Sequence, residues 1–174
     1  MTLLKNYFFI LSLTSMLFLN CSKSDDNSNT AAKGTITLSG EETSIFGTSL
    51  VVANILEGAY QTGTEASVTL LHKNINIDTD GEIAPTPTSL TESFIIVTAQ
   101  FDSDDSADVE KAISMIIIKN SEEYRFTCTS TASDDDCGDG FQVNQADRQV
   151  IFNNTTVVNT ESEKILTMNG TITW

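Results

Sequence analysis

The sequence predicts an all-β fold, an antiparallel β-sandwich or a flattened barrel, for the part of the chain that follows residue 33. Two observations carry this prediction. Apolar and polar residues alternate along several short segments, which is the period of a strand with one buried face. Clusters of Gly, Pro, Asn and Asp separate these segments at intervals typical of turns between antiparallel strands.

Five segments have a single apolar face. In chain order they are residues 34–38, 68–72, 123–128, 150–158 and 165–174. In the last of them Leu166, Met168, Gly170, Ile172 and Trp174 share one face, and threonines occupy much of the other. Each segment is therefore expected to place one side on a common core.

Two further segments, 94–101 and 113–118, are apolar on both faces, which predicts the central strands of the sheet system. Residues 105–112 are compatible with one or two helical turns before the second segment, although the β-branched residues that follow argue against a long helix. Turns are expected at residues 40–42, 80–81, 85–87, 120–121, 138–140 and 159–163.

The phrases GTITL (34–38) and GTITW (170–174) nearly repeat each other. Because the domain contains one such pair, they predict two similar strands that are candidates to be neighbours, and not a repeat architecture.

The N-terminus has the layout of a secretory signal peptide. Lys5 precedes an apolar run at residues 7–19, which ends directly before Asn20 and Cys21. A membrane-spanning helix needs about 20 apolar residues, so this run is too short to span comfortably, and a permanent anchor helix is the weaker interpretation. We expect a signal peptide at 1–20, a flexible acidic tether at 21–33 and a β domain at 34–174.

Residues 17–21, LFLNC, resemble the lipobox of bacterial lipoproteins, in which the cysteine is lipidated and becomes the first mature residue. The following stretch SKSDDNSN resembles lipoproteins of the Bacteroidetes, where a lysine followed by acidic residues can signal export to the cell surface. Residues 148–174 are similar to small uncharacterised flavobacterial lipoproteins, which implies no activity. The resemblance implies a palmitate-type lipid anchor on Cys21, an outer-membrane location and display at the cell surface. A secreted protein with an unmodified Cys21 is the alternative.

The composition is strongly acidic. The whole chain carries a formal charge of −15, and removal of residues 1–20, which contain one lysine, leaves −16. Nucleic-acid binding depends on a basic patch that neutralises phosphates, so nucleic acid is not expected as a partner. An acidic surface also disfavours adsorption to anionic head groups, which leaves the acyl chains to hold the protein at the membrane.

The chain has three cysteines. If Cys21 carries lipid, Cys128 and Cys137 are left as a natural pair in an oxidising compartment. So short a closed loop is worth roughly 2–3 kcal/mol on the loop-entropy model. The alternatives are two free thiols or a metal site, which would need further ligands while the single histidine is distant in sequence.

Residues 76–83 are the strongest candidate for a cofactor site, since oxygen ligands at alternate positions followed by glycine are how a calcium loop begins. The candidate ligands are Asn76, Asp78, Asp80 and Glu82. Pro87 stands where the closing carboxylate should be, so a strand that runs into an Asp-Gly turn is the favoured interpretation. The acidic stretches 102–108 and 134–139 are weaker candidates and are interpreted as solvated turns.

For catalysis the sequence offers His72, its only histidine, and no nucleophile-elbow, zinc-protease or phosphate-loop motif. An ordinary histidine at a strand end is favoured over a Ser-His-Asp arrangement built on it. Separately, the tripeptide 105–107 resembles the Asp-Ser/Thr-small sites of O-glycosylation in exported Bacteroidetes proteins, with Ser106 as the acceptor.

Together these observations predict a non-enzymatic envelope lipoprotein whose β domain binds a glycan, a peptide or another envelope protein. A calcium-dependent structural or adhesion module is the second hypothesis, and a hydrolase is the third.

Overall fold

The computed structural model describes residues 32–58, 67–101, 108–131, 136–138 and 140–174. The predicted signal peptide, most of the predicted tether, Cys21 and Ser106 lie outside the described residues. The described strands are β1 (Gly34–Gly40), β2 (Ser49–Glu57), β3 (Ser67–His72), β4 (Ile75–Ile77), β5 (Ile83–Pro85), β6 (Glu92–Gln100), β7 (Val109–Lys119), β8 (Glu122–Thr131), β9 (Gln142–Asn144), β10 (Gln149–Asn159) and β11 (Ile165–Thr173), and the described helix is α1 (Thr43–Phe46). The prediction of an all-β antiparallel fold is confirmed.

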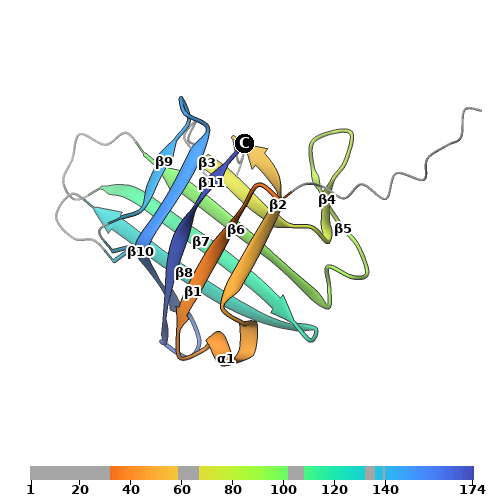
Figure 1. Ribbon diagram of the computed structural model, residues 1–174, viewed down its shortest axis with the longest axis horizontal. Helices are drawn as coiled ribbons and strands as arrows, with labels where there is room; N and C mark the ends of the chain where they lie inside the picture. Colours follow the sequence, from red (N-terminus) through yellow and green to blue (C-terminus); the bar gives the residue numbers. More distant parts are fainter. Residues whose placement is uncertain (1–31, 59–66, 102–107, 132–135, 139) are drawn as a thin grey trace, which may run out of the picture.

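Eight of the strands form one closed antiparallel barrel, which Figure 1 shows as a sheet that curls back on itself. Each barrel strand pairs with the next in the order β1, β2, β3, β6, β7, β8, β10 and β11, and β11 returns to pair with β1. The short strand β9 pairs with β10, while β4 and β5 form a separate hairpin between β3 and β6. Of the two expected architectures, the molecule therefore has the barrel.

Closure changes the meaning of the two segments that are apolar on both faces. β6 and β7 are adjacent in the middle of the strand order, but a closed ring of strands has no centre, so a central position has no meaning in this barrel. Thr69 and Leu71, on the outer face of β3 beside β6, are buried as well. Leu71 and Ile75 are buried outside the main core cluster, and the side-chain amide of Asn54 on β2 donates to the carbonyl oxygen of Ile75 on β4 at 2.7 Å. The outward-facing residues of the two segments themselves are only half-buried: Ile95 and Val97 on β6, and Ile116 and Ile118 on β7.

The near repeat GTITL and GTITW does mark neighbouring strands, because β1 pairs with β11 and Leu38 lies opposite Met168. The glycines of the two phrases permit this close approach. A β-carbon on Gly170 would lie 2.5 Å from the carbonyl oxygen of Thr35, and one on Gly34 would lie 2.8 Å from that of Thr171.

Large apolar side chains fill the interior of the barrel. An eight-stranded barrel is just wide enough either to be filled by its own side chains or to hold one small ligand. The inward-facing core residues include Ile36, Leu38, Val52, Leu70, Ile96, Met115, Phe126, Phe152, Leu166, Met168 and Ile172, all of them buried. Because this core is continuous, a binding site is to be sought at an end of the barrel.

Two local departures from the predicted elements have physical causes. Strand β2 was not predicted, because its pairing with β3 shifts between Val52 and Asn54 and the period of two is interrupted there. The expectation of helical turns at 105–112 is wrong for the four residues 109–112, which begin β7. A helix forms instead at α1, a single turn in the connection between β1 and β2.

The shortest ladder of the barrel joins β8 to β10, at two residue pairs that include Val158 and Thr127. Beyond them the backbone of residues 136–137 bridges the two strands. The N–H of Asp136 donates to the carbonyl oxygen of Thr129 at 3.1 Å, and that of Thr156 donates to the carbonyl oxygen of Cys137 at 2.9 Å. Cys137 is bonded to Cys128 with a Cα–Cα distance of 5.1 Å, which confirms the predicted disulfide. The disulfide therefore holds the segment that bridges this ladder.

Reduction of the Cys128–Cys137 disulfide is expected to lower the free energy of unfolding by roughly 2–3 kcal/mol, because the unfolded chain regains the freedom of the closed loop. Urea unfolding of a Cys21→Ala chain with and without reductant measures this loss. The same chain carrying Cys128→Ser and Cys137→Ser is the control, since its unfolding midpoint should not respond to reductant. Equal midpoints for the parent in both conditions would refute the prediction.

Candidate functional site

A cavity of about 250 Å³ opens at the end of the barrel that carries α1, called here the α1 end. At this end β1 joins β2 through α1, β7 joins β8, and β10 joins β11 (Figure 1). The antiparallel order brings the first residues of β2 and β6 to the same end as the last residues of β3 and β7. These four strand ends and Phe46 of α1 line the cavity.

The floor of the cavity is apolar and continuous with the core of the barrel. It is formed by Phe46 of α1, Leu50 of β2, Phe94 of β6 and Ile117 of β7, all buried members of the core cluster. Apolar walls of this kind favour the transfer of an apolar group out of water at roughly 25 cal/mol per Å². The cavity can therefore hold the apolar part of a small molecule.

His72 is the last residue of β3 and continues the inward-facing row of Val68 and Leu70 toward the cavity. Its ring packs edge to face on Phe94 with centroids 5.4 Å apart. The N–H of Asn74 donates to Nδ1 at 3.2 Å, so a neutral ring carries its proton on Nε2. Burial, and next the charge of Lys73, lower the pKa of His72 below its ordinary value. At neutral pH the imidazole is thus uncharged and has an Nε2–H to donate.

Three charged residues form the rim of the cavity: Lys73, Glu92 and Lys119. Glu92 and Lys119 lie opposite each other on β6 and β7 and form an ion pair, and this hydrogen bond lowers the pKa of Glu92. Within the described residues Lys73 enters no ion pair. The rim therefore carries a formal charge of +1, in a chain whose total is −15.

Local backbone geometry fixes two of these charges. Asn120 and Ser121 both have positive φ, as a tight two-residue hairpin turn requires, and this turn places Lys119 at the barrel end. In the turn after β3, the side-chain amide of Asn74 donates to the carbonyl oxygen of Glu92 at 2.7 Å. That bond ties the turn after His72 to the start of β6, so that the turn containing Lys73 is held beside the cavity.

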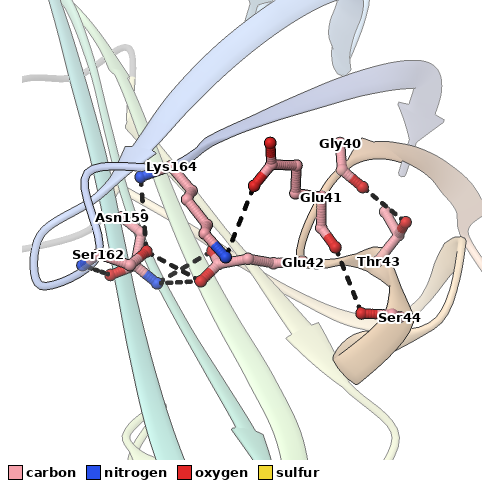
Figure 2. Close-up of polar contacts among 8 residues, drawn as sticks. All are labelled: Gly40, Glu41, Glu42, Thr43, Ser44, Asn159, Ser162 and Lys164. Carbon is pink, nitrogen blue, oxygen red and sulfur yellow. Dashed lines mark hydrogen bonds and ion pairs between the residues drawn. The ribbon is translucent and has the colours of Figure 1, made fainter.

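A buried polar cluster secures α1 over this end of the barrel. Figure 2 shows the side chains of Glu42, Asn159 and Ser162 pointing toward one another. The amide nitrogen of Asn159 donates to both carboxylate oxygens of Glu42, at 3.3 and 3.1 Å, and the Ser162 hydroxyl donates to one of them at 2.9 Å. Glu42 is 6% exposed and Asn159 is 3% exposed. The cluster thus fastens the residue before α1 to the turn between β10 and β11.

The hydrogen bonds of Glu42 also position Phe46 in the cavity floor. The carbonyl oxygen of Glu42 accepts hydrogen bonds from the N–H groups of Ile45 and Phe46. Glu42 therefore binds the polar cluster through its side chain and the first turn of α1 through its backbone. Phe46 then packs edge to face on Tyr124 and Phe126, with ring centroids 4.7 and 5.6 Å apart. Asn159 does not line the cavity, but it supports Phe46 through its hydrogen bonds to Glu42.

The candidate calcium residues lie on the β4–β5 hairpin. A carboxylate oxygen of Asp78 accepts from the N–H groups of Asp80 and Glu82, both at 2.9 Å, and the N–H of Gly81 donates to the Asp78 carbonyl oxygen. This is the strand running into an Asp-Gly turn that the sequence favours. Among the described residues, no group of three or more His, Cys, Asp or Glu side chains is placed to hold a metal ion. A calcium site with Asn76 as its first ligand stays a prediction.

A Ser-His-Asp arrangement would need a serine beside His72. Ser49 and Ser93 also line the cavity, and the hydroxyl of Ser93 donates to the carbonyl oxygen of Ser89 at 2.6 Å. Glu92, the acidic residue of the rim, is paired with Lys119. His72 is the last residue of β3, and its role as an ordinary histidine at a strand end stays a prediction.

Sequence reasoning singled out His72 but missed the other cavity residues, Lys73, Glu92 and Lys119 among them. They come from β2, β6, β7, α1 and the turn after β3, and only the closed order of the barrel brings them together. The composition gave one signal: the chain has nine Lys and Arg against 24 Asp and Glu, so each basic residue is a rare group on an acidic protein.

Comparison with protein-family models, curated proteins and solved structures gave no match to this chain. No helix within the described ranges has the length and apolar character needed to cross a membrane.

Proposed function

We propose that this chain is a non-enzymatic binding protein of the cell envelope, anchored by lipid on Cys21, which binds a small molecule in the cavity at the α1 end. The observation that carries the proposal is the cavity itself, with a floor of core side chains and a rim of charged ones. Sites for small molecules are typically concave and mostly apolar, with a few polar groups that orient the ligand. The filled interior directs binding to the mouth of the barrel.

The size of the cavity limits the ligand. Drug-sized pockets occupy roughly 300–1,000 Å³, so about 250 Å³ suits a small molecule or the end of a longer one. A glycan, peptide or envelope protein, the partners expected from the sequence, would have to present such a group. This requirement makes a small amphipathic molecule the favoured ligand.

The lipid anchor is tested apart from the cavity. Metabolic labelling with a palmitate analogue is expected to mark the native chain and not a Cys21→Ala variant. Two or more acyl chains hold a protein stably, whereas one does so only marginally. Equal labelling of the two chains would refute lipidation and leave the cavity proposal standing.

The cavity is tested by protein-observed NMR with a library of small fragments of mixed charge and apolar content. Fragments that bind are expected to shift the amide signals of residues 46–51, 72–73, 92–94 and 117–119. A Ser49→Trp variant should lose these responses, because Ser49 lines the cavity and an indole there would occlude it. Ser39→Trp, on an exposed position of β1, is the matched control. Responses confined to another surface, or unchanged in Ser49→Trp, would refute the proposal.

A further inference from the structure

The charges around the cavity differ in sign from the rest of the molecule. Lys119 is balanced by Glu92, whereas Lys73 enters no ion pair within the described part of the chain, so the rim has an excess of one positive charge. The chain as a whole carries −15. A locally positive site on an acidic protein selects among ligands by charge, since most of the surface repels anions and this spot attracts them.

The field of these lysines reaches into the cavity. The charges of Lys73 and Lys119 both oppose protonation of His72, and the charge of Glu92 favours it, so all three act on the imidazole. Burial of the ring also lowers the pKa of His72, and it has a larger effect than the charge of either lysine. The cavity thus presents an ammonium group at its rim and an uncharged imidazole N–H within it, both of which are hydrogen-bond donors.

We propose that the ligand of this cavity is a small amphipathic monoanion, such as a medium-chain carboxylate. Its anionic group would accept hydrogen bonds from Lys73 and from Nε2 of His72, and its apolar chain would lie on Phe46, Leu50 and Phe94. This assignment rests on the proposed function and adds the chemical class of the ligand. A cationic ligand would face Lys73 without a free counter-charge, and a neutral one would gain no charge attraction from the exposed ammonium group of Lys73.

Calorimetric titration with three compounds of equal chain length, octanoate, octanol and octylamine, tests the charge class. Octanoate is expected to bind about tenfold more tightly than octanol, because a hydrogen bond to a charged group strengthens binding and solvent screens part of that gain. Octylamine is expected to bind more weakly than octanol. The preference for octanoate should decrease as the salt concentration rises.

Two lysine variants locate the effect. Lys73→Gln is expected to weaken octanoate binding about fivefold and to leave octanol binding unchanged, because it removes one charge and keeps most of the side chain. Lys111→Gln is the matched control: Lys111 lies near the start of β7, at the end opposite Lys119, and its loss should change neither.

The outcomes separate this inference from the proposed function. If octanol binds as tightly as octanoate, or if fragments bind at the cavity while none of the three compounds does, the ligand is not an anion and the binding function stands. Octanoate binding that is unchanged in Lys73→Gln or in Ser49→Trp would likewise overturn the assignment. If neither the fragments nor the three compounds bind, both proposals fail.

Discussion

Replacement of Asn159 by aspartate is expected to lower the free energy of unfolding by roughly 3 kcal/mol or more at pH 7. The amide nitrogen of Asn159 now donates to the carboxylate of Glu42, and both groups are almost fully buried. Aspartate puts an anionic oxygen in place of this donor, directly beside a second carboxylate. Two such groups cannot both remain ionised without a large cost.

The loss should depend on pH with a definite sign. The folded Asn159→Asp chain can relieve the repulsion by keeping one proton on the two carboxyl groups, so near neutral pH it binds more protons than the unfolded chain. Its stability therefore falls as the pH rises, and the difference from the parent is largest at pH 7 and smaller near pH 5. Urea unfolding of both chains at several pH values measures this dependence.

Two further variants test the pairing of Asn159 with Glu42. Glu42→Gln in the Asn159→Asp chain reverses donor and acceptor, and it should recover most of the lost stability. Asn120→Asp adds the same charge at an exposed turn, and it should change the free energy of unfolding by less than about 0.5 kcal/mol. The pairing of Asn159 with Glu42 would be contradicted by an Asn159→Asp chain as stable as Asn120→Asp at pH 7, or by a double variant that recovers none of the lost stability.

Replacement of Gly140 by alanine is expected to cost about 3 kcal/mol of unfolding free energy. A β-carbon on Gly140 would overlap the carbonyl oxygen of Asn153 and lie 2.8 Å from its carbonyl carbon. Both are backbone atoms of β10, so no side chain can move aside. To relieve the overlap, the chain must shift next to Phe141, which is buried against Phe152 with ring centroids 5.8 Å apart.

The matched control for Gly140→Ala is Gly81→Ala. Gly81 has a φ of +83°, but no atom lies within 4 Å of the position that an added β-carbon would take. Alanine there should therefore cost only the left-handed strain, roughly 1–2 kcal/mol. Thermal and urea unfolding of both variants compare the costs. A Gly140→Ala chain no less stable than Gly81→Ala would show that the segment does not press on β10.

The strands with a clean period of two were predictable, because one buried face is enough to specify them. This holds for β1, β8 and β11, and the near repeat also made β1 and β11 candidates to be neighbours, as they are. The bulge after Val52 concealed β2, and the three-residue strands β5 and β9 are too short to show a period. Closure into a barrel depends on a pairing between the first and last strands, which periodicity does not encode.

The cavity was less predictable than the fold. Its apolar floor consists of ordinary core residues, and its charged rim is assembled from strand ends that are distant in sequence. Asn159 and Glu42 are separated by 117 positions, and neither belongs to a recognisable motif. Of the cavity residues, only His72 was singled out from the sequence, whereas the disulfide could be assigned beforehand because the cysteine count left Cys128 and Cys137 as a pair.

The central claim is that a ligand sits in the mouth of the barrel and does not enter its interior. Intermolecular NOEs between isotope-labelled protein and the tightest-binding fragment test this claim most directly. We expect NOEs to the side chains of Phe46, Leu50, Phe94 and Ile117, which form the cavity floor. NOEs to core residues that do not line the cavity, such as Phe152 and Met168, would contradict it.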